Sequence, residues 1–135
     1  MALITWSDKY FVGVRAIDAQ HAGLVETLNE LHGAMMKGQA SSVTGALLHK
    51  LVDYTHGHFS AEEQLMAATK YPSLTQHTAK HRALTTQVEE FVGRYERGEV
   101  RINLELLTFL SDWLTTHILK EDHEYGPWLN QHGVR

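Results

Sequence analysis

Histidines and a carboxylate stand in this chain at positions where a helical pattern calls for apolar side chains. In the stretch "THGHFSAEEQLM", residues 55–66, the apolar stripe that runs from Leu47 to Leu65 passes through His58 and Glu62. Both side chains would therefore point toward a hydrophobic core. An imidazole and a carboxylate one turn apart inside a core constrain the fold strongly, because each of them must find a partner there.

Apolar residues spaced three and four apart mark four helical segments. We expect helices from about Asp18, a good N-cap, to Gly38, from Ser41 or Ser42 to Thr69, from Ser73 to Glu96, and from a cap at Asn103 to about Gly126 and Pro127. Pro72 in "KYPS" separates the second helix from the third, since it disfavours a helical Tyr71. No alternation of period two competes with these helices, and 135 residues suffice for one core but not for two. The sequence therefore predicts an all-α fold in a single domain, residues 1–135.

Short connections between four helices favour an antiparallel up-down-up-down bundle, with an N-terminal arm on which Trp6 and Phe11 pack over the helices. In such a bundle the starts of the odd helices and the ends of the even helices lie at the same end. The inward polar residues occupy those ends: His21 in the first helix, His58 and Glu62 in the second, His77 and His81 in the third, and His117 in the fourth. We expect all of them to meet at one level.

The cost of burying so many polar groups indicates a shared partner. A lone histidine on an apolar stripe is usually an ordinary core residue with a hydrogen bond. Each buried polar group without a good partner costs roughly 1 to 3 kcal/mol, so six or seven would cost about as much as the ~5 to 15 kcal/mol by which a domain is stable. The chain has no cysteine, and imidazoles clustered with carboxylates suit iron, manganese, zinc or copper.

The spacing of the candidate ligands supports a common centre. Residues four apart lie only about 40° off one line, so His58 with Glu62, and His77 with His81, each present two donors to one point. Asp122 follows His117 by five residues and would lie about 140° away on a regular helix. It can join only through a looser, π-type turn, and Glu121 is better placed, so spacing leaves the choice between the two open.

These motifs resemble those of a known family. The segments "IDAQH", "HFSAEE", "HTAKH" and "HILKED" give the order H, HxxxE, HxxxH and HxxxxD on four helices. This constellation closely resembles the seven-ligand signature of hemerythrins, in particular the single-domain bacterial ones. The similarity extends to the "W....VG...ID.QH" pattern before the first helix and covers nearly the whole chain.

The resemblance implies a non-haem di-iron centre. By analogy His77, His81 and His117 would hold one iron, and His21 and His58 the other. Glu62 and Asp122 would bridge the two irons together with an oxo or hydroxo group, which favours Asp122 over Glu121. The iron with two histidines has an open position, where hemerythrin-like sites bind dioxygen reversibly.

Apolar residues close to the ligands could wall the oxygen site and exclude water, besides forming ordinary bundle core. The candidates are Ile17, Leu24, Phe59, Met66, Trp113, Leu114 and Ile118. Leu114, one turn before His117, is the candidate for controlling the entry of gas. The other histidines are expected to be ordinary residues outside the centre: His32, His49, His56, His123 and His132.

Three classes of function fit such a site. We favour an oxygen-binding protein for storage, transport or delivery, because the sequence ends soon after the last candidate ligand. The alternatives are an oxygen or redox sensor that acts through a separate partner, and a di-iron redox enzyme such as a ferroxidase, a peroxidase or a nitric oxide reductase. Ferritin-like oxidases use two Glu-x-x-His motifs, and neither Glu62 nor Glu121 begins one, so the chain is not expected to be an enzyme.

Charge and hydropathy limit the partners and the location. A net charge of -4 gives no basic face for nucleic acid or an anionic membrane. No segment approaches the roughly 18 apolar residues that span a bilayer, and the start resembles no signal peptide. We therefore expect a cytoplasmic monomer without membrane insertion, which binds dioxygen and could deliver it to an oxygen-consuming oxidase or oxygenase.

Overall fold

Helices make up nearly all of the described chain. The computed structural model describes residues 3–39, 41–99, 101 and 104–135, with the exception of the side chains at 41, 120 and 121. Its α-helices are α1 (Arg15–Met36), α2 (Ser41–Ala68), α3 (Leu74–Glu96), α4 (Leu104–Thr116) and α5 (His123–Gln131). A π-helical segment, His117–Asp122, joins α4 to α5, so that these three form one continuous rod. It packs beside α1, α2 and α3 as the fourth rod of the bundle.

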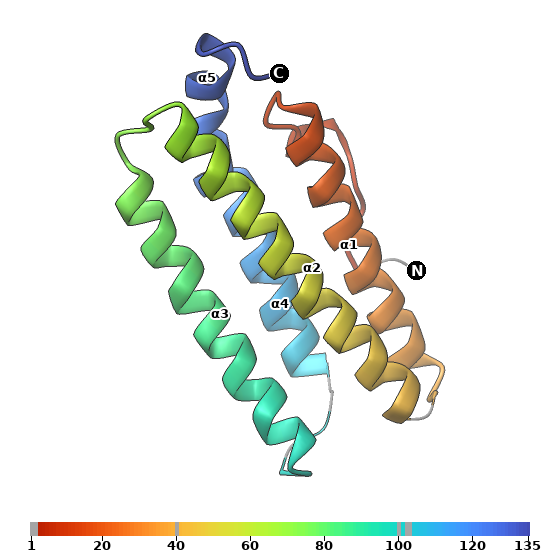
Figure 1. The fold of residues 1–135 in the computed structure, drawn as a ribbon. Coiled ribbons are helices and arrows are strands. Elements are labelled where there is room, and N and C mark those ends of the chain that lie inside the picture. Colours follow the sequence, from red (N-terminus) through yellow and green to blue (C-terminus); the bar gives the residue numbers. More distant parts are fainter. Residues whose placement is uncertain (1–2, 40, 100, 102–103) are drawn as a thin grey trace.

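The helices pack as an antiparallel bundle (Figure 1). α1 runs toward one end, α2 returns, α3 runs in the direction of α1, and α4 with α5 returns beside it. Among the described residues there is no strand, which confirms the predicted all-α, up-down-up-down architecture. The starts of α1 and α3 therefore lie at the same end as the last part of α2 and of the fourth rod.

The connections between helices follow the sequence prediction closely. α1 ends two residues before Gly38, which adopts φ +66°, a left-handed conformation that glycine accepts without strain. The amide of Gln39 then donates to the carbonyl of Ala34, 3.1 Å away, and closes the helix end. The break around Pro72 is also as predicted, and Ser73 occupies the N-cap position of α3 without a side-chain capping hydrogen bond. The predicted cap at Asn103 lies outside the described residues.

Two apolar clusters fill the bundle, one on each side of the candidate ligands. The larger cluster contains Leu24, Leu28, Leu31, Leu48, Leu51, Leu107, Leu110 and Leu114, all nearly fully buried. The smaller one lies toward the start of α1 and the end of the fourth rod, and contains Val12, Val14, Ile17, Met66, Tyr125 and Leu129. Between the two, along each helix, come the histidines and carboxylates that the sequence singled out. The core thus places them in one polar layer.

The first helix begins earlier than predicted. Asp18 was expected to be its N-cap, but α1 starts at Arg15 with Val14 as the cap residue. The carboxylate of Asp18 instead accepts a hydrogen bond from the amide of Val12 at 2.7 Å. The acidic side chain near the helix start therefore fastens the N-terminal arm to α1.

The last helix also extends beyond its predicted end. Gly126 and Pro127 were expected to stop it, but α5 continues to Gln131 with Pro127 inside. A proline inside a helix costs about 3 kcal/mol. Tyr125 and Leu129 are fully buried on the same helix, and each large apolar side chain contributes about 1.5 to 3 kcal/mol on burial. Their burial outweighs the break that the proline favours.

The N-terminal arm packs over the bundle through Trp6, as predicted, and also through Tyr10. Trp6 stacks on Tyr10 with the ring centroids 5.2 Å apart, and Tyr10 is the buried aromatic residue. Phe11 was expected to pack as well, but it is 47% exposed. Asn29 on α1 holds the arm by exchanging two hydrogen bonds with the backbone of Ile4, at 2.9 and 2.8 Å.

We predict that Gly126→Ala destabilises the protein by about 1 to 3 kcal/mol. A β-carbon at Gly126 would collide with the backbone carbonyl oxygen of Val12, where the arm crosses α5. Gly57→Ala is the matched control, because a β-carbon there meets nothing within 4 Å and alanine favours the helix by up to about 1 kcal/mol. Urea unfolding of both variants measures the difference. Equal stability of the two variants would contradict the close crossing.

Candidate metal centre

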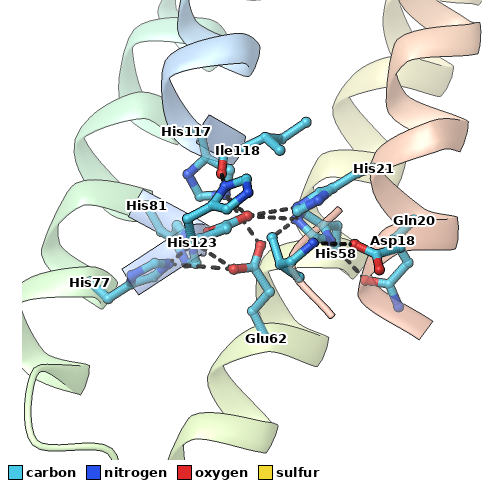
Figure 2. A network of polar contacts seen from close by, with 12 residues as sticks. Asp18, Gln20, His21, His58, Glu62, His77, His81, His117, Ile118 and His123 are labelled. Carbon is cyan, nitrogen blue, oxygen red and sulfur yellow. Dashed lines mark hydrogen bonds and ion pairs between the residues drawn. The ribbon is translucent and has the colours of Figure 1, made fainter. Parts of the chain in front are cut away.

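The polar layer brings together all seven predicted ligand residues, and Figure 2 labels all of them except Asp122. His21 comes from α1, His58 and Glu62 from α2, His77 and His81 from α3, and His117 and Asp122 from the π-helical segment. All seven side chains are buried, His77 being the most accessible at 5%. Their imidazole and carboxylate atoms point toward one another between the two apolar clusters.

The histidines of α1 and α2 form one side of the layer. Nε2 of His21 lies 3.0 Å from Nε2 of His58. The same atom of His21 lies 2.6 Å from Oδ2 of Asp122. Nε2 of His58 contacts Oε1 of Glu62, four residues later on the same helix. The ring nitrogens of this pair therefore face both carboxylates.

The histidines of α3 and of the fourth rod form the other side. Nε2 of His77 lies 3.3 Å from Oδ1 of Asp122 and 3.4 Å from Oε2 of Glu62. Nε2 of His117 lies 3.0 Å from Oδ2 of Asp122 and 3.2 Å from Oε1 of Glu62. Nε2 of His81 is 4.0 Å from Oε2 of Glu62. Glu62 and Asp122 thus each contact histidines on both sides.

The π-helical segment explains how Asp122 reaches the centre. On a regular α-helix Asp122 would point away from His117, but the backbone is π-helical over His117–Asp122, where residues five apart share one face. This wider turn is the distortion that the sequence analysis required for Asp122 to join the centre. His123 supports it, because its Nδ1 donates to the carbonyl of Ile118 at 2.7 Å. The side chain of Glu121 lies outside the described residues.

The charges in the layer balance one another. Burial would raise the pKa values of Glu62 and Asp122, and repulsion from Asp122 would raise that of Glu62 further. The surrounding histidines, mainly His58 for Glu62 and His117 for Asp122, outweigh this and hold both pKa values below their usual range. Both groups are therefore carboxylates at neutral pH.

The histidines divide into two kinds. Burial alone would lower the pKa of His58 and of His77, but the carboxylates raise the pKa of His58, and they raise that of His77 to about 9. Burial lowers the pKa of His21, and it lowers that of His81 to about 3. Without metal, the raised pKa values thus favour the cationic form of His58 and His77 beside the two carboxylates, while the lowered pKa values favour the neutral form of His21 and His81.

Unsatisfied polar atoms test whether a metal pair fits this layer. Folded proteins rarely leave buried polar atoms without a partner. Among the described residues, several atoms that face the centre have ion-pair contacts within the layer but no hydrogen bond of good geometry: Oε2 of Glu62, Nε2 of His77, Nε2 of His81 and both carboxylate oxygens of Asp122. Two sets of donor atoms, each within 4.8 Å of one another, meet here and share Glu62, His117 and Asp122. Two adjacent cations would satisfy these atoms, so the residues fit a di-metal group.

The predicted apolar wall is split between the two clusters. Ile17 and Met66 belong to the smaller cluster, whereas Leu24, Phe59, Trp113, Leu114 and Ile118 belong to the larger one. Phe59 stacks on His81 with the ring centroids 3.8 Å apart, and Trp113 stacks on His117 at 5.9 Å. These two aromatic residues therefore cover the three-histidine side of the layer.

The remaining histidines lie apart from the centre or beside it. His49 and His56 are exposed and contact Glu96 and Glu89 at 3.0 and 3.1 Å. His132 binds the carbonyl of Trp128 at 2.8 Å, also near the surface. Sequence patterns missed Gln20 beside His58, and Tyr125, whose ring lies 5.5 Å from that of His77. Gln20 stands in the "IDAQH" segment and Tyr125 follows Asp122 by three residues, but the sequence assigned neither residue a role.

Comparisons with known proteins agree with this geometry. The family model described as "Hemerythrin HHE cation binding domain" matches residues 12–129. The chain belongs to the hemerythrin family. It is 39% identical over 132 residues to a bacteriohemerythrin of Stenotrophomonas maltophilia, covering 98% of this chain and 85% of that protein. It is 34% identical over 131 residues to a bacteriohemerythrin of Methylococcus capsulatus, covering 96% and 99%.

Solved hemerythrin structures share the fold of this family member. A wild-type hemerythrin superposes with a TM-score of 0.90 at 34% identity, covering 95% of this chain and 98% of that one. A hemerythrin with a leucine-to-tyrosine substitution gives a TM-score of 0.91 at the same identity. The likeness extends over almost the full length of both chains, so it includes every helix that contributes to the polar layer.

We predict that metal uptake releases protons and becomes stronger as the pH rises. Binding through Nε2 requires neutral imidazole, whereas His58 and His77 have raised pKa values, about 9 for His77. Between about pH 6 and pH 8 the apparent affinity should increase about tenfold per pH unit for each proton displaced. Calorimetric titration of the metal-free protein with Zn²⁺, in buffers of different ionisation enthalpy, measures both quantities. An affinity independent of pH in this range would contradict the charge assignment.

Proposed function

We propose that this chain binds dioxygen reversibly at a di-iron centre and thereby stores, transports or delivers it. The observation that carries the proposal is the buried layer in which both carboxylates contact histidines on two opposite sides. His21 and His58 would hold one iron. His77, His81 and His117 would hold the other, with Glu62 and Asp122 between them. The match to the hemerythrin family and to bacteriohemerythrins supports iron as the metal.

The chain's own residues suit reversible binding. A pair of ferrous ions, when bound, would supply the electrons and the open coordination position that dioxygen requires. Glu62 and Asp122 offset the charge of these ions inside a dry core. Leu24, Leu114 and Ile118 are at most 1% exposed, exclude water and have no proton to donate to a bound oxygen molecule. Such surroundings favour release of dioxygen over its irreversible reduction.

The role as a carrier is tested by following the visible absorption of the purified protein. The protein is loaded with iron, reduced without oxygen, exposed to air and then evacuated, over several cycles. A carrier should gain an absorption band in air and lose it under vacuum each time. A band that decays at once, or the consumption of many equivalents of oxygen, would identify an enzyme instead. We propose an oxygen-consuming oxidase or oxygenase as the recipient of the oxygen.

Leu114→Ala should change the rate of oxygen loss or the rate of autoxidation. Leu114 is 1% exposed, lies one turn before His117 and belongs to the larger apolar cluster beside the polar layer, so its truncation opens space for gas and water. Leu104→Ala is the matched control, since Leu104 begins the same helix and is 54% exposed. Stopped-flow release and the decay of the oxygenated form in air measure the two rates. If both rates stay unchanged, Leu114 does not control access.

Within the described residues, no helix combines the length and the apolar composition that crossing a membrane requires.

A further inference from the structure

Gln20 touches the candidate centre from outside the set of seven ligands. It lies on α1 immediately before His21 and is partly buried. Its side-chain oxygen lies 2.7 Å from Nδ1 of His58 on α2 (Figure 2). The other ring nitrogen of His58, Nε2, faces the opposite way, toward His21 and Glu62. The imidazole of His58 therefore lies between an amide and the metal layer.

The chemistry of the amide oxygen decides which nitrogen of His58 carries hydrogen. A carbonyl oxygen only accepts hydrogen bonds, so Nδ1 of His58 must be the donor. This holds whether the ring is neutral or cationic. Nε2 is then the nitrogen that offers a lone pair to a metal, and the hydrogen bond also fixes the plane of the ring.

We infer that Gln20 is a positioning residue, which holds His58 in the tautomer and orientation that bind metal through Nε2. The inference rests on the proposed di-iron function and names a residue that tunes its two-histidine side. The histidines of that side are His21 and His58 alone, and Nδ1 of His21 is buried without a hydrogen bond. On the other side, Nδ1 of His81 lies 3.7 Å from Oε2 of Glu63, beyond hydrogen-bonding distance. Gln20 thus orients one of the two histidines that flank the open position.

The neutral charge of Gln20 has a functional consequence. A carboxylate at the same place would pull more strongly on the Nδ1 hydrogen and make His58 a stronger electron donor, which favours the ferric state. A neutral amide orients the ring without increasing the electron donation from His58. Gln20 therefore helps to keep the ferrous state accessible, which is the state that takes up dioxygen.

The test uses the full chain freed of metal and titrated with Co²⁺, whose visible absorption reports each equivalent bound. The variants are Gln20→Met, which removes the acceptor at similar volume, and Gln20→Glu, which keeps it. Gln64→Met is the matched control, because Gln64 is exposed on α2 and contacts only Ser60, at 3.4 Å, among the described hydrogen bonds. Circular dichroism confirms that each variant is folded.

In Gln20→Met one of the two equivalents should bind about 10 to 100 times more weakly, while the other is unchanged. Gln64→Met should behave as the wild type. Gln20→Glu should restore the affinity and, in the iron-loaded protein, shift the reduction potential to more negative values. Nuclear magnetic resonance of the Zn²⁺-loaded wild type should find the hydrogen of His58 on Nδ1.

Several results would overturn the inference. Equal affinities in Gln20→Met and wild type would show that the hydrogen bond has no effect on the centre. Weak binding that Gln20→Glu does not restore would point to lost packing instead of a lost acceptor. A hydrogen on Nε2 of His58 would exclude the assigned tautomer. If the wild type itself fails to take up two equivalents, the proposed function fails together with the inference, which separates this case from the others.

Discussion

Glu62→Gln should strip most of the metal from the purified protein. Oε1 of Glu62 contacts His58 and lies 3.2 Å from His117, and Oε2 lies 3.4 Å from His77, so this carboxylate joins both sides of the layer. An uncharged amide can neither bridge two cations through two oxygens nor balance their charge. Removing one partner from a buried charged network costs about 3 to 5 kcal/mol, which corresponds to metal affinity weakened by about a hundredfold or more.

Elemental analysis of iron per chain, after expression in iron-rich medium, measures this effect. Glu89→Gln is the matched control, since Glu89 is exposed on α3 and contacts only the exposed His56 among the described ion pairs. The control should retain the wild-type iron content. Wild-type iron content in Glu62→Gln would mean that this carboxylate does not hold the metal.

Removal of the metal should lower the stability of the whole bundle. The polar layer lies in the middle of the core, and several of its buried oxygen and nitrogen atoms make no hydrogen bond of good geometry without metal, so folding and metal binding are coupled. At a free metal concentration of about a thousand times the dissociation constant, binding adds about 4 kcal/mol to the free energy of unfolding. For a domain of this size the melting temperature should rise by roughly 10 °C. Thermal unfolding with Zn²⁺ and with a chelator compares the two states, and equal melting temperatures would contradict the coupling.

The metal-free protein should also lose stability as the solution becomes alkaline. The carboxylates raise the pKa of His77 in the folded state to about 9, from about 6.5 in the unfolded chain. A group whose pKa rises on folding contributes stability that is fully present below about pH 6.5 and disappears as the pH passes through about 9. The pKa of His58 is also raised in the folded state, so His58 contributes to the pH dependence of stability with the same sign. This pH dependence should vanish in the Zn²⁺-loaded protein, where these imidazoles are held neutral.

The sequence was most informative where periodicity and topology act together. Spacing by four places His58 with Glu62, and His77 with His81, on inward faces, and the alternating helix directions bring distant pairs to one level. These two rules predicted both the fold and the meeting of the histidines. These rules did not predict that Asp122 joins the centre. Its position depends on a π-helical distortion, which the residue spacing permits but does not require.

The features that the sequence missed depend on contacts between distant segments. The early start of α1 reflects the hydrogen bond from Val12 to Asp18, and α5 continues through Pro127 because Tyr125 and Leu129 are buried. Gln20 gives no periodic signal, since its role depends on where α2 places His58. Local propensity therefore identified the elements, whereas tertiary packing decided their ends and the surroundings of the ligands.

Anomalous diffraction at the iron absorption edge, from crystals of the iron-loaded protein, locates the metal ions relative to the seven ligand residues. We expect two adjacent peaks inside the polar layer. One should lie against the histidines of α1 and α2, the other against those of α3 and the π-helical segment, with Glu62 and Asp122 reaching both. A single peak, peaks outside the layer, or no iron in the crystal would contradict it.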